Sequence, residues 1–286
     1  MTLVLAVVAG ALIGLSLGAL GGGGSILAVP VLVYALGQSP AQATTGSLVV
    51  VGVTSLIGAI AAHRAGNVLL GRGIGFGVVA IGGAALGAKA SALVPGPVLL
   101  AAFSALMLLV GTVMAVRQVR NSRARVLVPA GGGAFEDQDE LQARVTLDDP
   151  ILTFSPKFAC RCPQALKVLI TATVVGLLTG FLGVGGGFLV VPALLLALAL
   201  PMEYAAGTSL VVIALTSVSA LAVRAGVGVA PDWGLVLVLT GVSAVAGVLG
   251  ARLADRIDTH KLSAAFTVLV VLVAIYTAAR ALPALC

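Results

Sequence analysis

The sequence contains few charged and few aromatic residues. Of its 286 residues only 9% are charged and 4% aromatic, whereas 60% are hydrophobic and the mean hydropathy is +1.19. Soluble domains carry about 25% charged residues, so the composition excludes an ordinary soluble domain. It also excludes a disordered chain, which combines low hydrophobicity with high net charge. We therefore expect an all-α polytopic membrane protein that crosses the membrane several times and is surrounded by membrane lipid.

Cysteine and histidine are also scarce, and this limits the chemistry available. Cys160, Cys162 and Cys286 are too few for a disulfide framework, and a CxC without a second pair does not complete a zinc site. His63 and His260 both fall at the ends of apolar segments. The chain has no HExxH, no GxSxG, no Walker lysine and no paired carboxylates within an apolar segment. We expect no enzyme activity, no metal and no cofactor.

The charges that are present concentrate in one stretch. Between Arg117 and Lys167 lie 14 of the 26 charged side chains. The net charge of +6 does not indicate nucleic acid, because the basic residues follow apolar runs and do not interleave with aromatics. The predicted organisation is a first membrane repeat (1–117), a polar cytoplasmic linker (118–166) and a second membrane repeat (167–286).

The two apolar regions resemble each other in sequence, which indicates two homologous four-segment halves. At an offset of 162, one pair of segments shares 10 of 17 residues and another shares 7 of 13, and at an offset of 163 a third pair shares 9 of 20. A short fourth match, GAK with GAR, has the same offset as the third. The pairs are Gly14–Pro30 with Gly176–Pro192, Ala43–Ser55 with Ala205–Ser217, Val98–Arg117 with Lys261–Arg280, and Gly87–Lys89 with Gly250–Arg252.

Segment lengths predict about eight transmembrane segments, since a helix needs roughly 20 apolar residues to cross a bilayer. The opening segment of each half, 3–35 or 167–200, is too long for one crossing and is interrupted by glycines and then by Pro30 or Pro192. Each half thus opens with a Gly-broken discontinuous helix. The other expected segments are 41–62, 73–94 and 98–116 in the first half, and 205–223, 233–251 and 262–280 in the second.

Basic residues do not decide how the halves are oriented. Eight full crossings place 12 of the 16 Lys and Arg residues inside and make the halves parallel. A re-entrant opening segment in each half places 13 inside and makes the halves inverted. Both orientations stay open at this point.

The glycine breaks are the predicted substrate-binding site. Backbone N–H groups freed at membrane depth have to face protein or water, and the half-helix that follows adds a partial positive charge at its N-terminus. Glycine also allows a ligand to approach the backbone closely. This combination suits a small anion. The candidate residues are Gly21, Gly22, Gly23, Gly24, Ser25, Thr45, Ser47, Gly183, Gly185, Gly186, Gly187, Thr208 and Ser209, with Pro30 and Pro192 as helix breaks.

Other small residues have simpler interpretations. Gly14 with Gly18, and Gly176 with Gly180, form GxxxG pairs, which favour close helix packing. The hydroxyl residues of the candidate site can equally be helix caps or ligand donors, and both readings stay open. The Thr-Ser pairs at 54–55 and 216–217 are expected to bond their own backbone or a neighbouring helix.

These motifs resemble the TauE/SafE sulfite exporter family, also called the toluene sulfonate uptake permease family. The pattern GxLGxGGG-x4-P fits Gly180–Pro192, whereas the first copy has Ser25 at its last glycine position, and each copy is followed by A-x3-SL-x5-TS. The resemblance implies transport of sulfite, sulfonates or similar anions across the cytoplasmic (inner) membrane. The duplicated breaks suggest a secondary transporter that works by alternating access, in which one half rocks against the other. The alternatives are an anion channel of the same fold, or a membrane subunit of a larger complex. The expected partner is a small anionic substrate, and a homo-oligomer stays open.

Overall fold

Every element that the structure describes is helical. The computed structural model describes residues 2–22, 24–126, 162–183, 187–197, 200, 202–225, 231–254 and 267–277. In chain order the elements are α1 (Thr2–Leu20), α2 (Ser25–Pro30), the π-helix η1 (Val31–Ala35), α3 (Pro40–Arg64), α4 (Leu70–Ser91), α5 (Gly96–Val126), α7 (Cys162–Leu182), α8 (Gly187–Ala197), α9 (Met202–Ala225) and α10 (Trp233–Ala254), followed by a helix at Thr267–Thr277.

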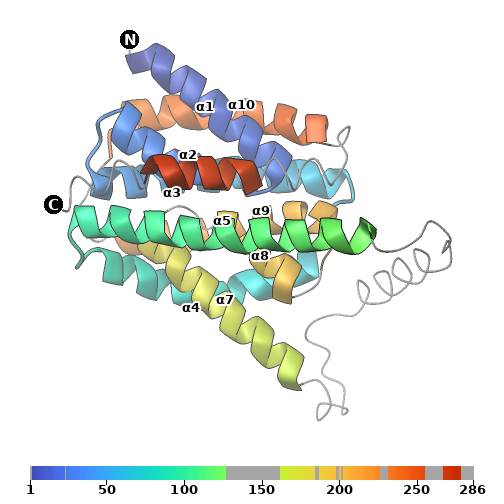
Figure 1. The fold of residues 1–286 in the computed structure, drawn as a ribbon. Helices are drawn as coiled ribbons and strands as arrows, with labels where there is room; N and C mark the ends of the chain where they lie inside the picture. Colours follow the sequence, from blue (N-terminus) through green and yellow to red (C-terminus); the bar gives the residue numbers. More distant parts are fainter. Residues whose placement is uncertain are drawn as a thin grey trace.

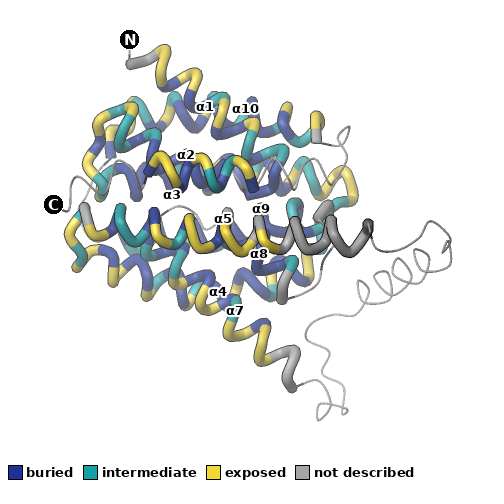
Figure 2. Tube along the Cα trace, in the orientation of Figure 1, coloured by how far each residue is buried: buried dark blue, intermediate teal, exposed yellow. Residues whose placement is uncertain are grey.

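Four of these helices are long and apolar enough to cross a membrane: Pro40–Arg64, Leu70–Ser91, Tyr204–Ala225 and Trp233–Leu253. Five shorter apolar helices accompany them within the described residues. Large hydrophobic side chains such as Leu86, Leu109 and Leu237 are exposed, and Figure 2 shows exposed residues along the outer faces of the helices. Such surfaces suit lipid. The described helices are therefore consistent with the predicted polytopic all-helical membrane protein.

Local signals explain where two of the crossing helices begin. At α3, the Ser39 Oγ accepts from the Gln42 N–H while the Gln42 side chain accepts from the Ser39 N–H, and Pro40 takes the first helical position. This capping box satisfies N–H groups that the first turn leaves free. At α10, the Asp232 carboxylate accepts from the Gly234 N–H at 3.1 Å. Its negative charge also suits a helix N-terminus.

Two pairs of helices have the most extensive contacts, α1 with α10 and α7 with α4. Figure 1 shows α1 and α7 each inclined across its partner. Glycines allow the approach: a Cβ on Gly18 would lie 1.9 Å from Gly247 O, and a Cβ on Gly180 would lie 1.9 Å from Ala84 O. The GxxxG glycines thus pack directly against the neighbouring backbone, as the packing interpretation predicts.

Helices α3 and α9 pack antiparallel. Gly58 lies against Leu210 near the start of α9, whereas Thr44, near the start of α3, contacts Arg224 near the end of α9. The start of α3 and the end of α9 therefore lie at the same end of the molecule. Because the sequence alignment pairs these two segments, aligned segments run in opposite directions.

The segment after α1 runs back toward the start of α3. Gly21 lies against Ser209 in the first turns of α9, whereas Leu32 in η1 lies against Gly46 in the first turns of α3. The structure also differs from the expected pair of half-helices. With 19 residues, α1 is about 28 Å long at 1.5 Å per residue, so a nearly full-length helix precedes a short returning one.

Helical structure extends into both ends of the predicted linker. Helix α5 continues past Arg117 to Val126, and α7 begins at Cys162. Straight-chain residues such as arginine favour a helix, so a charged segment can prolong one beyond the apolar run. The acidic run and Cys160 lie outside the described residues, and the domain boundaries stay a prediction.

Candidate functional site

At the first break the chain turns at Gly21, which has φ +74°. L-residues with side chains rarely adopt this conformation. A Cβ on Gly21 would also lie 2.4 Å from the Ala206 Cα. The Ser209 hydroxyl lies 3.0 Å from Gly21 O and 2.7 Å from Ala206 O, so it joins the break to α9.

The second break repeats this geometry with the partners exchanged. Gly183 has φ +66°, and a Cβ there would lie 2.5 Å from the Thr44 Cβ. The Ser47 hydroxyl donates to Gly183 O and lies 3.0 Å from Thr44 O in its own helix. Ser47 and Ser209, for which helix capping and ligand binding were both open, therefore hold the breaks in place in this conformation.

The two breaks touch each other in the interior. A Cβ on Gly22 would lie 2.2 Å from Gly187 O, and a Cβ on Gly187 would lie 2.6 Å from Gly22 O. The Ser25 hydroxyl donates to Gly22 O at 2.7 Å. Gly24 packs elsewhere, with the position of its Cβ only 2.2 Å from Ile13 O. This conformation leaves no room for an anion between Gly22 and Gly187.

The prolines do not form the breaks. Pro30 lies where α2 passes into the π-helix η1, and Pro192 lies within α8. A proline removes one backbone hydrogen bond, and a π-helical turn accommodates the missing donor. The chain is interrupted at the glycines instead. Of the predicted site residues, Gly23, Gly185 and Gly186 lie outside the described residues.

The two remaining threonines of the predicted site have partners in the protein. The Thr45 hydroxyl donates to Ala41 O at 3.0 Å within its own helix. The Thr208 hydroxyl accepts from the Leu69 N–H at 3.1 Å, at the start of α4. In this conformation both hydroxyls bond to backbone groups, Thr45 within its own helix and Thr208 between α9 and the start of α4.

We expected the Thr-Ser pairs at 54–55 and 216–217 to bond their own backbone or a neighbouring helix, and this is wrong for three of the four residues. The hydroxyls of Thr54, Ser55 and Ser217 are buried and have no hydrogen-bond partner among the described residues, whereas Thr216 donates to Val212 O at 2.9 Å. A serine in a helix reaches its own backbone carbonyls only in certain rotamers, and close packing fixes the rotamer. Here a Cβ on Gly52 would lie 3.0 Å from the Ser217 Cβ, so α3 packs tightly against this serine.

Replacing Ser217 by alanine is therefore expected to leave the melting temperature unchanged or to raise it. The substitution removes a buried hydroxyl with no partner, which can stabilise by about 1 kcal/mol. The matched control is Thr216→Val, which keeps the shape, loses a bonded hydroxyl and should destabilise by about 0.5–1 kcal/mol. Thermal unfolding in detergent measures both. A larger loss for Ser217→Ala than for Thr216→Val would show that the Ser217 hydroxyl is bonded.

Sequence reasoning missed the buried side chain of Arg224, which is 8% exposed. Its Nη1 donates to Thr44 Oγ1 and its Nη2 to Ser91 Oγ, both at 2.7 Å. Nη2 also lies 3.3 Å from Gly180 O, just before the second break. Arg224 follows directly on the apolar run 205–223, a position that is typical of a charge at the membrane surface and gives no sign of burial.

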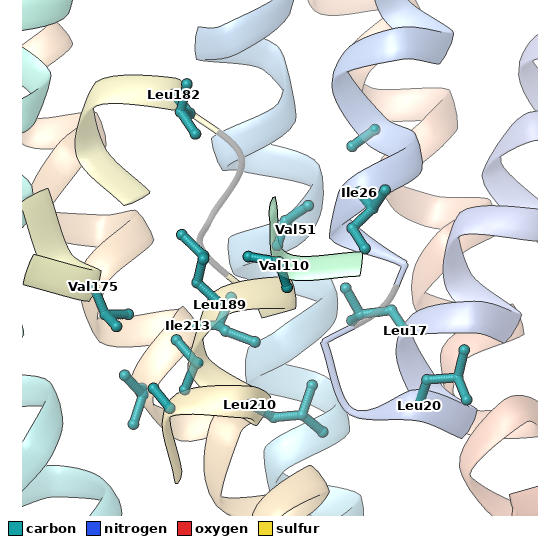
Figure 3. Packing of buried hydrophobic residues seen from close by; sticks show 14 of the residues in the cluster. Leu17, Leu20, Ile26, Val51, Val110, Val175, Leu182, Leu189, Leu210 and Ile213 are labelled. Carbon is teal, nitrogen blue, oxygen red and sulfur yellow. The ribbon is translucent and has the colours of Figure 1, made fainter. Parts of the chain in front are cut away.

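Apolar side chains surround the breaks. Figure 3 shows Leu17 and Ile26 beside the first break, and Leu182 and Leu189 beside the second. All four belong to one buried cluster that also includes Val51 of α3. Within the described residues, no group of three or more His, Cys, Asp or Glu side chains is arranged to hold a metal ion.

Comparisons with known proteins agree with this picture. A family model described as Sulfite exporter TauE/SafE matches residues 6–277. A "Probable membrane transporter protein" of Xylella fastidiosa strain 9a5c is 31% identical over 278 residues, covering 96% of this chain and 94% of the relative. A protein of the same name from strain Temecula1 is 32% identical with the same coverage. No solved structure matches the chain.

The apolar helices and these relatives define a multi-pass membrane transporter protein. The chain belongs to the TauE/SafE sulfite exporter family.

Proposed function

We propose that this chain is a secondary transporter that moves small sulfur-containing oxyanions, such as sulfite or sulfonates, across the cytoplasmic membrane by alternating access. The observation that carries the proposal is the contact of the two breaks at Gly22 and Gly187. Helices begin at Ser25 and Gly187, so two partially positive N-termini face the same interior region. That arrangement favours an anion once the breaks separate, because N-terminal N–H groups bind oxyanions.

The halves are, in this proposal, inverted repeats with re-entrant opening segments. Antiparallel packing of α3 and α9 supports inversion, since parallel halves would place aligned helices in the same direction. The returning course of α2 and η1 supports a re-entrant segment. Inverted repeats around a central site are a common basis for alternating access, in which one half rocks against the other.

Inversion predicts on which side of the membrane a cysteine at position 228 is labelled. The inverted arrangement with most basic residues inside places Gly228 outside, whereas eight full crossings place it inside. The three native cysteines are first replaced by serine, and a membrane-impermeant maleimide is applied to intact cells. We expect labelling of Gly228→Cys from outside, with Gly66→Cys between α3 and α4 as the inside control. Labelling of position 228 only after permeabilisation would contradict the inverted arrangement.

The test of the function is sulfite flux into proteoliposomes that contain the purified protein. We expect saturable flux that taurine and sulfate reduce and acetate does not, because the site is proposed to recognise a sulfur oxyanion. Liposomes without protein and liposomes with Gly22→Leu protein are the controls. Flux that acetate blocks as well as sulfate would overturn the substrate class, and flux that does not saturate would favour a channel of the same fold.

A further inference from the structure

The guanidinium of Arg224 is buried, and none of the described residues supplies a counter-ion. Each of its hydrogen-bond acceptors is neutral, either a hydroxyl or a backbone carbonyl. Its Nε is buried and has no partner, and no carboxylate pairs with it within the part of the chain that the structure describes. A buried charge without an opposite charge is strongly disfavoured. Membrane proteins keep such a residue where it meets a substrate or an ion.

Its neighbours also suggest a structural reading, in which Arg224 stabilises the end of α7. Gly180 O and Phe181 O belong to the last turn of α7, where a positive charge is favourable. The repeat alignment argues against this as the whole explanation. The counterpart of α7 is α1, which ends at an equivalent break, yet the position aligned with Arg224 is Ala62. The equivalent break therefore forms without an arginine at the aligned position.

The hydroxyl partners of Arg224 are likewise present in one half only. The alignment pairs Thr44 with Ala206 at an offset of 162 and Ser91 with Ala254 at an offset of 163. Three polar side chains from three helices thus converge at one break, and three alanines stand at the corresponding positions of the other. The two repeats share the glycines at which their helices pack, but they differ at these three positions. We therefore expect the cluster to have a role other than packing.

We propose that Arg224 is the residue that binds the negative charge of the transported oxyanion. The inference deepens the proposed function and rests on it. Nε–H and an Nη2–H form one edge of the guanidinium, and such an edge binds two oxygens of an oxyanion at once. An anion at this edge would satisfy the unpartnered Nε and would compete with Ser91 and Gly180 O for Nη2.

Binding at this edge also connects the anion to a conformational change. Arg224 joins α9 to Thr44 of α3 and Ser91 of α4, both in the first half. An anion on the Nε–Nη2 edge competes with Ser91 for Nη2, and so releases one of the two bonds that Arg224 makes to the first half, while Nη1 keeps Thr44. Anion binding thereby weakens the link between the halves at the end of the molecule where α3 begins and α9 ends, which favours the opening that alternating access requires.

The test measures thermal stabilisation of detergent-solubilised protein by sulfite, sulfate, acetate and chloride. A ligand that binds only the folded protein raises the melting temperature with its concentration, which gives an apparent Kd. We expect Arg224→Gln to weaken sulfite binding at least about tenfold, because it removes a charge-assisted pair of hydrogen bonds. Arg224→Lys keeps the charge but loses the two-point contact, and is expected to bind about three- to tenfold more weakly. The control is Arg64→Gln, which removes an exposed arginine at the end of α3.

The outcomes separate this inference from the proposed function. Wild-type affinity for sulfite in both Arg224 variants would overturn the role of Arg224 and leave sulfite transport standing. Binding of acetate but not sulfite, lost in Arg224→Gln, would support Arg224 and overturn the sulfur substrate. No stabilisation of the wild-type protein by any of the four anions would overturn the anion site. If Arg224→Gln does not fold, Arg224→Lys tests the proposal in its place. If the positive charge at position 224 were only structural, Arg224→Lys would bind sulfite with wild-type affinity.

Discussion

Replacing Gly187 by leucine is expected to abolish transport in a protein that still inserts in the membrane. Any side chain at this position would collide with Gly22 O, and the Cβ would also lie 2.7 Å from the Ser25 Oγ. Leucine would therefore hold the two breaks apart and fill the region between them. Displacement of site groups by about 1 Å is enough to lower a rate about a hundredfold, so we expect at least that loss.

The comparison for this prediction is Gly241→Leu, since Gly241 on α10 has open space around it. Sulfite flux per folded protein is measured for both variants, with the folded amount taken from size-exclusion chromatography. Gly241→Leu should transport at the wild-type rate. Wild-type flux in correctly folded Gly187→Leu would show that the contact between the breaks is not part of the transport site.

The second large effect is expected at Gly83, where leucine should prevent α4 and α7 from packing. A Cβ on Gly83 would lie 2.3 Å from Thr173 O, and a backbone atom cannot move aside without separating the helices. The adjacent Gly82 is exposed and has nothing within 4 Å of its Cβ position. Gly82→Leu, on the same helix and one residue away, is therefore the matched control.

We expect Gly83→Leu to lower the free energy of unfolding by about 3 kcal/mol or more, since overpacking in a close contact typically costs about 1–3 kcal/mol and leucine adds a whole side chain. Gly82→Leu should match or exceed wild-type stability, because leucine favours a helix over glycine. Yield of monodisperse protein and melting temperature in detergent measure both. Equal stability of the two variants would contradict the α4–α7 packing.

Sequence patterns predicted the membrane class and the packing glycines because both depend on local composition. A run of about 20 apolar residues indicates a membrane-crossing helix whatever the order of those residues. Two glycines four residues apart indicate a close helix contact even when the partner helix is unknown. Gly18 and Gly180 are examples, since each lies against backbone of another helix.

The sequence could not predict in which direction the helices of the two halves run or which distant segments touch. The basic residues favoured the inverted arrangement by one residue only, whereas the register of α3 against α9 depends on side-chain fit along the whole interface. The contact of Gly22 with Gly187 likewise depends on how α2 and α8 return into the interior. Local periodicity carries no information on either.

Arg224 shows why the polar part of the site was incomplete. An arginine at the end of an apolar segment usually reaches the membrane surface, so its position alone indicates an exposed charge. Only the packing of α3, α4 and α7 around it buries the guanidinium. Its partners Thr44 and Ser91 are separated from it by more than a hundred residues, with sequence separations of 180 and 133.

Counterflow is the measurement that tests the central claim most directly. Proteoliposomes are loaded with unlabelled sulfite and diluted into a trace of radiolabelled sulfite. A carrier that alternates between two sides exchanges one for the other, so labelled sulfite should accumulate transiently inside above its external concentration. Taurine or sulfate loaded in place of sulfite should also drive this uptake if both are substrates, and acetate should not. Equilibration without overshoot, in protein that carries sulfite flux, would contradict alternating access and identify a channel.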